Sequence, residues 1–203
     1  MLTNRKQRLI LGIILALALV CSIIVAVIVG ATDISLSAAL EGIGATLRRT
    51  TDTDVDTQII GQVRFPRAVL GAIVGAGLGI CGLITQSLLR NPLGDPYILG
   101  ISSGASTGAA AVIVFGTTSN ILSALGITFG AFLGAVASIL LVTLLASAGG
   151  KITPTRIIFA GMAVTYFFSA VTSLITLMAK NAAGTKSVMF WMLGSISNAT
   201  WHD

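Results

Sequence analysis

Charged side chains are scarce in this chain. Of its 203 residues, only 9% are Asp, Glu, Lys or Arg, whereas 55% are hydrophobic. A soluble domain carries about 25% charged residues, so this chain has too little polar surface to be one. The scarcity argues against a soluble enzyme, a nucleic-acid-binding protein and a disordered chain. The 12 Lys and Arg residues lie between apolar runs, as they do in loops that flank a bilayer.

Histidine and cysteine are nearly absent as well. The single histidine, His202, is one residue from the end of the sequence, and Cys21 and Cys81 each lie inside an apolar run. A metal site or a His-based catalytic unit needs several such residues close together. We therefore expect no metal centre, no catalytic residue and no cofactor, and we interpret both cysteines as small packing residues.

Long uncharged runs dominate the sequence instead. The first has 23 residues, which is about 35 Å of helix and enough to cross a hydrocarbon core of about 30 Å. It is too long for a secretory signal, whose apolar region has about 7–15 residues. The sequence predicts an all-α, polytopic transmembrane helix bundle. Its five expected spans are residues 9–31, 68–89, 97–116, 121–148 and 157–179, and the apolar stretch 188–201 is too short to be a sixth.

Basic residues set the expected orientation. With the N-terminus inside, six Lys and Arg residues fall on each side of the membrane, which is a tie. The first span breaks it, because Arg5, Lys6 and Arg8 precede it closely and no basic residue follows until Arg48. We expect a plasma-membrane protein with a cytoplasmic N-terminus.

The loop after the first span contains apolar residues at helical spacing, namely Leu36, Leu40, Ile43 and Leu47. This pattern predicts a short helix on the outer membrane surface. Three aspartates follow in a threonine-rich stretch that we interpret as a solvated loop: Asp52, Asp54 and Asp56.

Glycine recurs every four residues in three of the runs, as Gly71, Gly75 and Gly79, as Gly104 and Gly108, and as Gly130 and Gly134. Lipid does not drive apolar helices together, so small residues that allow close approach indicate helix packing in a bundle or a dimer. Residues 77–82 (GLGICG) also fit a dinucleotide-binding fingerprint. They lie inside an uncharged run, and the nearest acidic residue comes too early, so we expect no nucleotide there.

An unusual segment follows the second run. Pro92 and Pro96 end that helix and keep Asn91 and Asp95 out of helical geometry. Ser102 and Ser103 are good N-cap residues, so the next helix could begin only there. Such a pattern fits an irregular, re-entrant entry into the membrane beside a translocation pathway. A tight cytoplasmic turn between two packed helices explains it equally well.

Several motifs resemble the FecCD family, the membrane permeases of ABC importers for iron–siderophores, haem and cobalamin. They are residues 64–67 (RFPR), 90–96 (RNPLGDP), 99–105 (LGISSGA), 154–161 (PTRIIFAG) and 190–195 (FWMLGS). Members of that family have roughly 330 residues and about ten helices. The resemblance therefore implies about half of a fold like that of the vitamin B12 importer permease, and an N-terminal fragment that stops before the sixth helix.

The resemblance also implies roles for particular residues. Arg64 and Arg67 match the position that meets acidic residues of an extracytoplasmic binding protein, although they could instead snorkel to lipid headgroups. The cytoplasmic gate would be formed by residues of two loops: Asn91, Pro92, Leu93, Asp95, Pro96, Pro154 and Thr155. Partners would be a second permease subunit, cytoplasmic ATPase subunits that hydrolyse ATP in place of this chain, and the binding protein. The expected substrate is an iron(III)–siderophore, with haem or cobalamin as alternatives.

Two other classes remain open. An ion-coupled secondary transporter can also use a broken helix, but it usually places an ionisable residue in mid-membrane, and none lies well inside these five runs. A membrane-embedded enzyme would need a nucleophile, a base or metal ligands at that depth. Only Ser, Thr, Gln86 and the two isolated cysteines are available.

Overall fold

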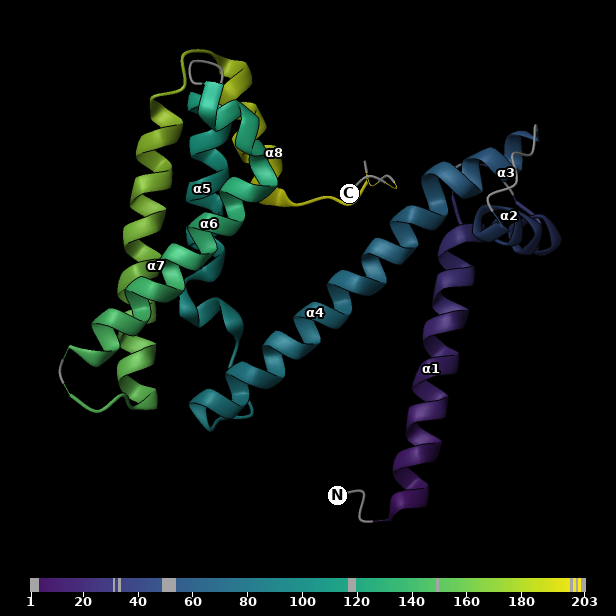
Figure 1. The fold of residues 1–203 in the computed structure, drawn as a ribbon, viewed down its shortest axis with the longest axis horizontal. Helices are drawn as coiled ribbons and strands as arrows, with labels where there is room; N and C mark the ends of the chain where they lie inside the picture. Colours follow the sequence, from purple (N-terminus) through teal and green to yellow (C-terminus); the bar gives the residue numbers. More distant parts are fainter. Residues whose placement is uncertain are drawn as a thin grey trace. The chain divides into compact units, whose positions relative to one another are not determined.

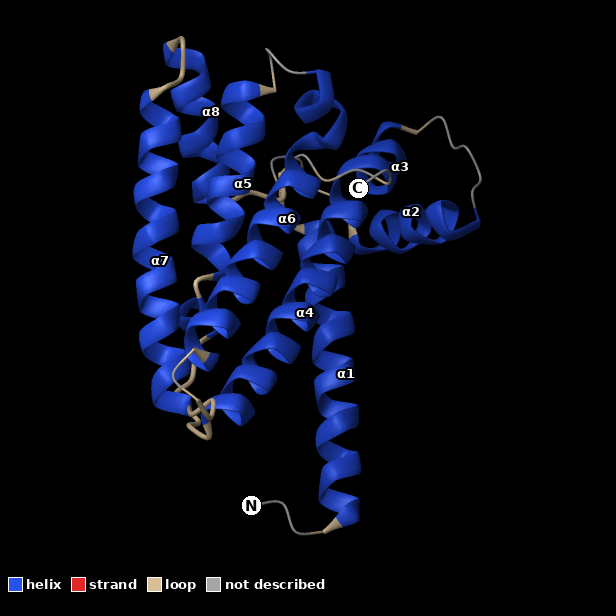
Figure 2. Ribbon diagram, turned by 60° about the vertical axis from the view of Figure 1, so that its left-hand side comes forward, coloured by secondary structure: helices blue, strands red, loops and turns tan. Residues whose placement is uncertain are grey.

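All regular structure in the described part of the chain is helical, as the composition predicts (Figure 2). The computed structural model describes residues 4–30, 32, 34–48, 54–116, 120–148, 150–197, 199 and 201, with only the backbone described from 120 to 125. Asp52 and His202 lie outside the described residues. The chain forms two compact units: Met1–Leu78 with Ser195–Asp203, and Gly79–Gly194. Each is described by itself.

The first unit begins with the long helix α1, Arg5–Ile28, which Asn4 caps by accepting a hydrogen bond from the amide of Lys6. The short helix α2, Leu36–Arg48, carries the predicted apolar spacing. A five-residue helix α3, Val55–Ile59, then runs through a π-helical turn, Ile60–Arg64, into α4, Phe65–Leu89. The chain is therefore helical without interruption from Val55 to Leu89.

A small core joins α1, α2 and the π-helical turn. Val27, Ala39 and Ile60 are all 0% exposed and belong to one apolar cluster. Gly42 allows α2 to approach closely, because a Cβ atom there would lie 2.7 Å from the side chain of Ile60. The leucines of α2 do not share this burial: Leu36, Leu40 and Leu47 remain more than half exposed. They are available to the membrane surface on which the sequence places this helix.

The second unit contains α5, Ile101–Phe115, α6, Asn120–Ser147, α7, Pro154–Leu177, and α8, Ala182–Leu193. Helices α5, α6 and α7 lie side by side (Figure 1). Helix α6 bends at Gly126, whose φ of 72° is not helical. Thr153 caps α7 and Asn181 caps α8 through their side-chain oxygens.

Glycines bring α5 and α6 into backbone contact. A Cβ atom at Gly104 would overlap the carbonyl oxygen of Gly134, and one at Gly108 would overlap that of Gly130. The glycine pair Gly104 and Gly108 of α5 therefore packs against the glycine pair Gly130 and Gly134 of α6. By contrast, Gly75 and Gly79 of α4 have nothing within 4 Å of such an atom in the described part of the chain. Their role in helix packing stays a prediction.

The helices differ from the expected spans in two places. Among the described residues, four helical stretches are long and apolar enough to cross a membrane, namely Arg5–Ile28, Val55–Leu89, Gly126–Ser147 and Pro154–Leu177. The sequence predicts five spans. Helix α5 has only 15 residues, about 22 Å of helix, because a separate turn occupies the first residues of the expected span at 97–116. The second stretch begins 13 residues earlier than expected, at Val55 rather than Ala68, since the Asp54–Arg67 region continues the helix of α4 instead of forming a loop.

The close approach of α5 and α6 gives a direct prediction. Gly108→Val should destabilise the protein, because the new side chain has no space against Gly130 and overpacking typically costs about 1–3 kcal/mol. The measurement is the thermal unfolding midpoint of the detergent-solubilised transporter. Gly12→Val, in an open position of α1, is the matched control and should leave the midpoint nearly unchanged. Equal midpoints for both variants would contradict the observed helix contact.

Candidate functional site

The chain leaves α4 through a tight turn. Arg90 has a φ of 50°, and it is the non-glycine residue with positive φ in the described part of the chain. The Oδ1 atom of Asn91 accepts a hydrogen bond from the amide of Leu93 at 3.0 Å, and the carbonyl of Asn91 accepts one from Gly94 at 3.0 Å. Leu93 at the tip is 85% exposed. The segment therefore forms a turn that is closed by its own hydrogen bonds and exposes the apolar side chain of Leu93.

A 3-10 turn, Pro96–Leu99, links this segment to α5. Asp95 caps it by accepting a hydrogen bond from the amide of Tyr97 at 2.9 Å. Helix α5 then begins at Ile101 after Gly100, whose φ is 68°. The expectation that Ser102 or Ser103 would act as N-cap is wrong. The hydroxyl of Ser103 instead donates to the carbonyl of Gly100 at 2.8 Å, because that carbonyl lies at the junction of two helices of different pitch.

Neighbouring helices hold this junction in place. The hydroxyl of Ser138 on α6 is 0% exposed and donates to the carbonyl of Gly100 at 2.7 Å. On α7, a Cβ atom at Gly161 would overlap the carbonyl oxygen of Ile98, so the 3-10 turn lies directly against that helix. Irregular backbone at membrane depth is tolerated only when it is buried in protein or lines a polar cavity. Here the carbonyls of Asp95, Tyr97 and Gly100 have donors, and Gly161 covers one side of the turn while Tyr97 remains 68% exposed on another.

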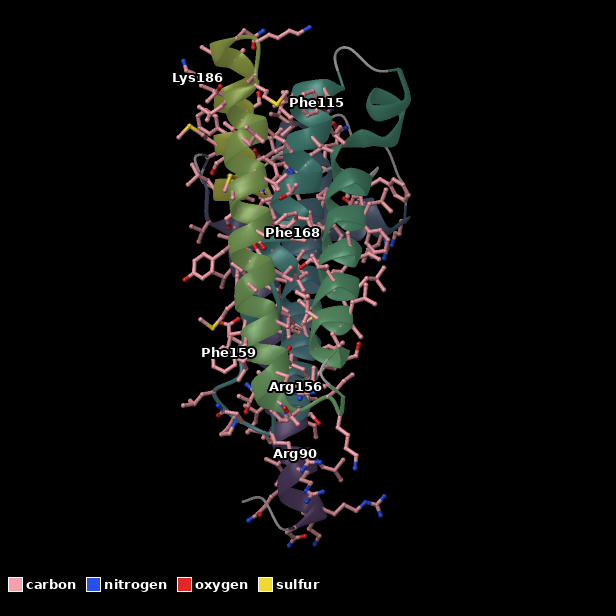
Figure 3. The ribbon with its side chains drawn as sticks, turned by 90° about the vertical axis from the view of Figure 1, so that its left-hand side faces the viewer. Arg90, Phe115, Arg156, Phe159, Phe168 and Lys186 are labelled. Carbon is pink, nitrogen blue, oxygen red and sulfur yellow. The ribbon has the colours of Figure 1, made fainter. Side chains whose placement is uncertain are left out.

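The start of α7 lies at the same end of the second unit. Leu89 at the end of α4 shares an apolar cluster with Ala146 on α6 and Ile157 on α7. Arg90 and Arg156 accordingly lie at one end of this unit and Lys186 at the other (Figure 3). Pro154 is the first residue of α7, where its missing amide proton costs no hydrogen bond. The two loops proposed as a gate thus leave from one end of the unit.

A hydroxyl-lined cavity of about 680 Å³ runs between α5 and α7. Its walls carry no charged side chain and are mostly Ser and Thr, with Tyr97, Leu177 and Met192 at the margins. The hydroxyl of Thr107 connects its two sides, lying 2.6 Å from that of Thr172 and donating to the carbonyl of Phe168. The polar residues of the lining are Ser102, Ser103, Ser106, Thr165, Ser169, Thr172, Ser173 and Thr176. Several of these hydroxyls, such as those of Thr165 and Thr176, already donate to carbonyls of their own helix, so the cavity offers mainly acceptor oxygens and no ionic attraction.

Sequence reasoning did not identify this cavity. The signal was present, since Thr165, Ser169, Thr172 and Thr176 recur at spacings of four, three and four and so share one face of α7. The spacing alone does not reveal a cavity, because a hydroxyl that bonds its own helix is also compatible with lipid.

In the first unit, Arg64 is almost completely buried. It is 8% exposed, and its Nη1 atom donates to the carbonyls of Val27 at 2.8 Å and Ile28 at 2.7 Å. Its Nη2 atom donates to the carbonyl and the hydroxyl of Thr32 at 2.8 and 2.6 Å. The guanidinium therefore binds the C-terminal end of α1, a partner that its place in the sequence did not indicate.

Arg67 lies one turn further along α4 and is half-buried. Its Nη2 atom donates to the carbonyl of Ser197, while its Nε atom is buried and has no hydrogen-bond partner among the described residues. Trp201 fixes the segment that contains Ser197, because its indole Nε1 donates to the carbonyl of Gly61 at 2.6 Å and its ring packs on Phe65. Arg67 also lines an apolar groove of about 990 Å³ between α1 and α4, together with Gly71 and Gly75.

Comparison with known proteins identifies the family of this chain. The family model of the FecCD transport family matches residues 15–203. The chain belongs to the FecCD transport family. Among curated FecCD relatives, it is 37% identical over 145 residues to the cobalamin import system permease protein BtuC of Halobacterium salinarum, covering 71% of this chain and 38% of the relative. It is 36% identical over 175 residues to the Fe(3+)-citrate import system permease protein YfmD of Bacillus subtilis, covering 86% and 49%.

A solved structure shares the FecCD fold. It is described as an inward-facing conformation of a putative metal-chelate type ABC transporter, and it superposes with a TM-score of 0.74 at 28% sequence identity. The match covers 97% of this chain and 56% of the solved chain. The chain thus spans about half the length of the FecCD relatives it matches. The family and the apolar helices together identify a multi-pass membrane protein.

Proposed function

We propose that this chain forms part of the membrane permease of an ABC importer, and that its second unit lines one side of the route that the substrate takes. The observation that carries the proposal is the break in the helices between Arg90 and Gly100, which lies beside the uncharged hydroxyl cavity of α5 and α7. Broken helices at membrane depth commonly form substrate pathways. Membership of the FecCD family gives the class of transporter.

The proposed substrate is an iron(III)–siderophore, with haem or cobalamin as the alternatives. A large metal chelate presents many polar oxygen and nitrogen atoms, and a wall of neutral hydroxyls can bond them without holding them by charge. Weak binding of this kind suits a pathway, because a substrate has to leave its sites as easily as it enters them. The names of the two relatives above, for cobalamin and for ferric citrate, are compatible with this range.

The proposed cytoplasmic gate consists of the turn after α4 and the start of α7. Asn91, Pro92, Leu93, Asp95 and Pro96 form the first part, and Pro154 with Thr155 forms the second. Support comes from their common end of the second unit and from the exposure of Leu93. The turn is compact, since Asn91 accepts hydrogen bonds from the amides of Leu93 and Gly94, and the amide of Asn91 ties it to the carbonyl of Gln86 on α4.

The proposed partners are a second permease subunit, cytoplasmic ATPase subunits and an extracytoplasmic binding protein. ATP would be hydrolysed on the separate ATPase. The binding protein would dock at the outer end of α4, near Arg64 and Arg67, through acidic residues of its own. Complementary charge speeds and orients such docking. The open small-residue face of α4, with Gly71, Gly75 and Gly79, would pack against further helices of the assembly.

Uptake assays test the proposed function. A cell in which the gene is deleted should lose uptake of radiolabelled iron presented as a siderophore complex, and the intact gene should restore it. Parallel assays with haem and with cobalamin identify the substrate. No loss of uptake for any of the three compounds would contradict the proposal.

The energy source separates an ABC importer from an ion-coupled carrier in the same assay. A substitution that inactivates the ATPase subunit should abolish uptake, whereas a protonophore at unchanged cellular ATP should have little effect. Uptake that survives loss of the ATPase and disappears with the protonophore would favour the ion-coupled alternative.

Thiol labelling tests the proposed orientation. In a protein whose native cysteines are replaced, Gly150→Cys should react with an impermeant thiol reagent only after lysis, because the Lys151–Arg156 end is expected in the cytoplasm. Val55→Cys, which replaces a residue 67% exposed at the start of α3, should react in intact cells. Labelling of Gly150→Cys in intact cells would reverse the orientation and place Arg67 on the wrong side for a binding protein.

A further inference from the structure

We propose that the two neighbouring arginines have different roles: Arg64 is a positioning residue that anchors the end of α1 to α4, and Arg67 alone offers its charge to the docking partner. This inference rests on the proposed docking of a binding protein at the outer end of α4. According to this inference, Arg64 stabilises the fold of the permease itself and does not contact the binding protein.

The hydrogen bonds of Arg64 show that its guanidinium is held at the C-terminal end of α1. A helix end leaves its last carbonyls without intrahelical donors, and the end of a helix also carries partial negative charge. The guanidinium supplies both the missing donors and a positive charge at this helix end. Its Nη1 atom donates to the carbonyls of Val27 and Ile28, and its Nη2 atom donates to Thr32 beyond the helix end. Charged donors make such bonds shorter and stronger than neutral ones. With 8% of its surface exposed, Arg64 has little left to present to another protein.

Gly30 leaves the space that the guanidinium of Arg64 occupies. A Cβ atom at this position would lie 2.5 Å from Nη2 of Arg64 and 2.6 Å from its Cζ atom. The absence of a side chain at Gly30 is therefore what lets the guanidinium reach the end of α1. The π-helical turn that ends at Arg64 belongs to the same arrangement, since its Ile60 packs beside Val27 in the apolar core.

Arg67 differs from Arg64 in what remains available. Among the described residues, its guanidinium makes one hydrogen bond, from Nη2 to the carbonyl of Ser197, whereas that of Arg64 makes four. Both arginines border the apolar groove, but Arg67 is only half-buried whereas Arg64 is 8% exposed. A carboxylate from another protein could thus bind Arg67 without breaking the anchor, whereas binding Arg64 would remove the donors from the end of α1.

The experiment uses the full-length transporter with its ATPase and binding protein, with Cys21 and Cys81 replaced by serine and with Val27→Cys as reporter. Val27 is 0% exposed, so its replacement reports opening of the anchor by reaction with a thiol reagent. Arg64→Met and Arg67→Met are compared, and the affinity of the binding protein is measured at several salt concentrations. Gly30→Ala displaces the Arg64 guanidinium without changing any charge. Gly12→Ala is its matched control, because nothing lies within 4 Å of that position.

Arg64→Met and Gly30→Ala should both raise the labelling rate by roughly tenfold, since one hydrogen bond to a charged group changes an equilibrium by about that factor. Gly12→Ala and Arg67→Met should leave the rate unchanged. Only Arg67→Met should reduce the salt dependence of docking, because only it removes a charge that meets the partner. If Arg64→Met does not assemble, Gly30→Ala still provides the test with both arginines in place.

Two outcomes would separate this inference from the docking proposal. If Arg64→Met reduces the salt dependence as much as Arg67→Met does, while Gly30→Ala leaves labelling unchanged, the anchor is overturned and docking by both arginines stands. If no variant alters the salt dependence, docking at this surface is wrong. In that case the labelling rates of Arg64→Met and Gly30→Ala alone test whether Arg64 anchors the end of α1: a rise in both supports the anchor, and no rise contradicts it.

Discussion

Backbone carbonyls that no helix can satisfy need donors from elsewhere, and this requirement governs the irregular parts of the molecule. In a bilayer, water cannot supply the missing hydrogen bonds, and each unpaired group costs several kcal/mol. Two such places in the described residues have a side-chain donor from another segment: Arg64 serves the end of α1, and Trp201 serves Gly61 in the π-helical turn. At the start of α5, Ser138 adds a further donor to the carbonyl of Gly100, which already accepts the amide of Gly104.

The same requirement explains how the chain can depart from a helix between Arg90 and Gly100. The Arg90–Gly100 segment is stable because Asn91 and Asp95 bond the local amides and Ser138 bonds the junction carbonyl. The backbone is thereby free to depart from a helix next to a hydroxyl-lined cavity. A continuous helix would present only side chains there. The break thereby places a compact turn at one end of the proposed substrate route.

The sequence was sufficient for the fold class and the family. Uncharged runs long enough to cross a bilayer predict helices because lipid excludes other backbone structures, and the FecCD motifs are long enough to be specific; both expectations are confirmed. The glycine spacings indicated close packing, and the structure shows the pairs of α5 facing those of α6. These signals are local or periodic, so they can be read without knowing the fold.

The partners of particular side chains could not be predicted in this way. Arg64 bonds residues 32 to 37 positions earlier in the chain, and Ser138 bonds Gly100 across 38 positions. No local pattern encodes such pairings, so the sequence suggests docking or headgroup contact for Arg64 and does not indicate its partners at the end of α1. The start of the second long helix also differs from the expectation, since Asp54 and Asp56 suggest a loop while Asp54 instead precedes α3 as its N-cap residue. Charge near a helix end is compatible with both structures.

The most direct test of the account asks whether the broken segment and the hydroxyl cavity line the substrate route. Leu93→Cys and Ser106→Cys, in an assembled transporter without other cysteines, should react with a small polar thiol reagent, and the transported substrate should protect both. Leu144→Cys replaces a residue of α6 that is 65% exposed and lies outside the cavity, so the substrate should not affect its reactivity. If the substrate leaves the reactivity of Leu93→Cys and Ser106→Cys unchanged, or protects all three positions equally, the account of the pathway is wrong.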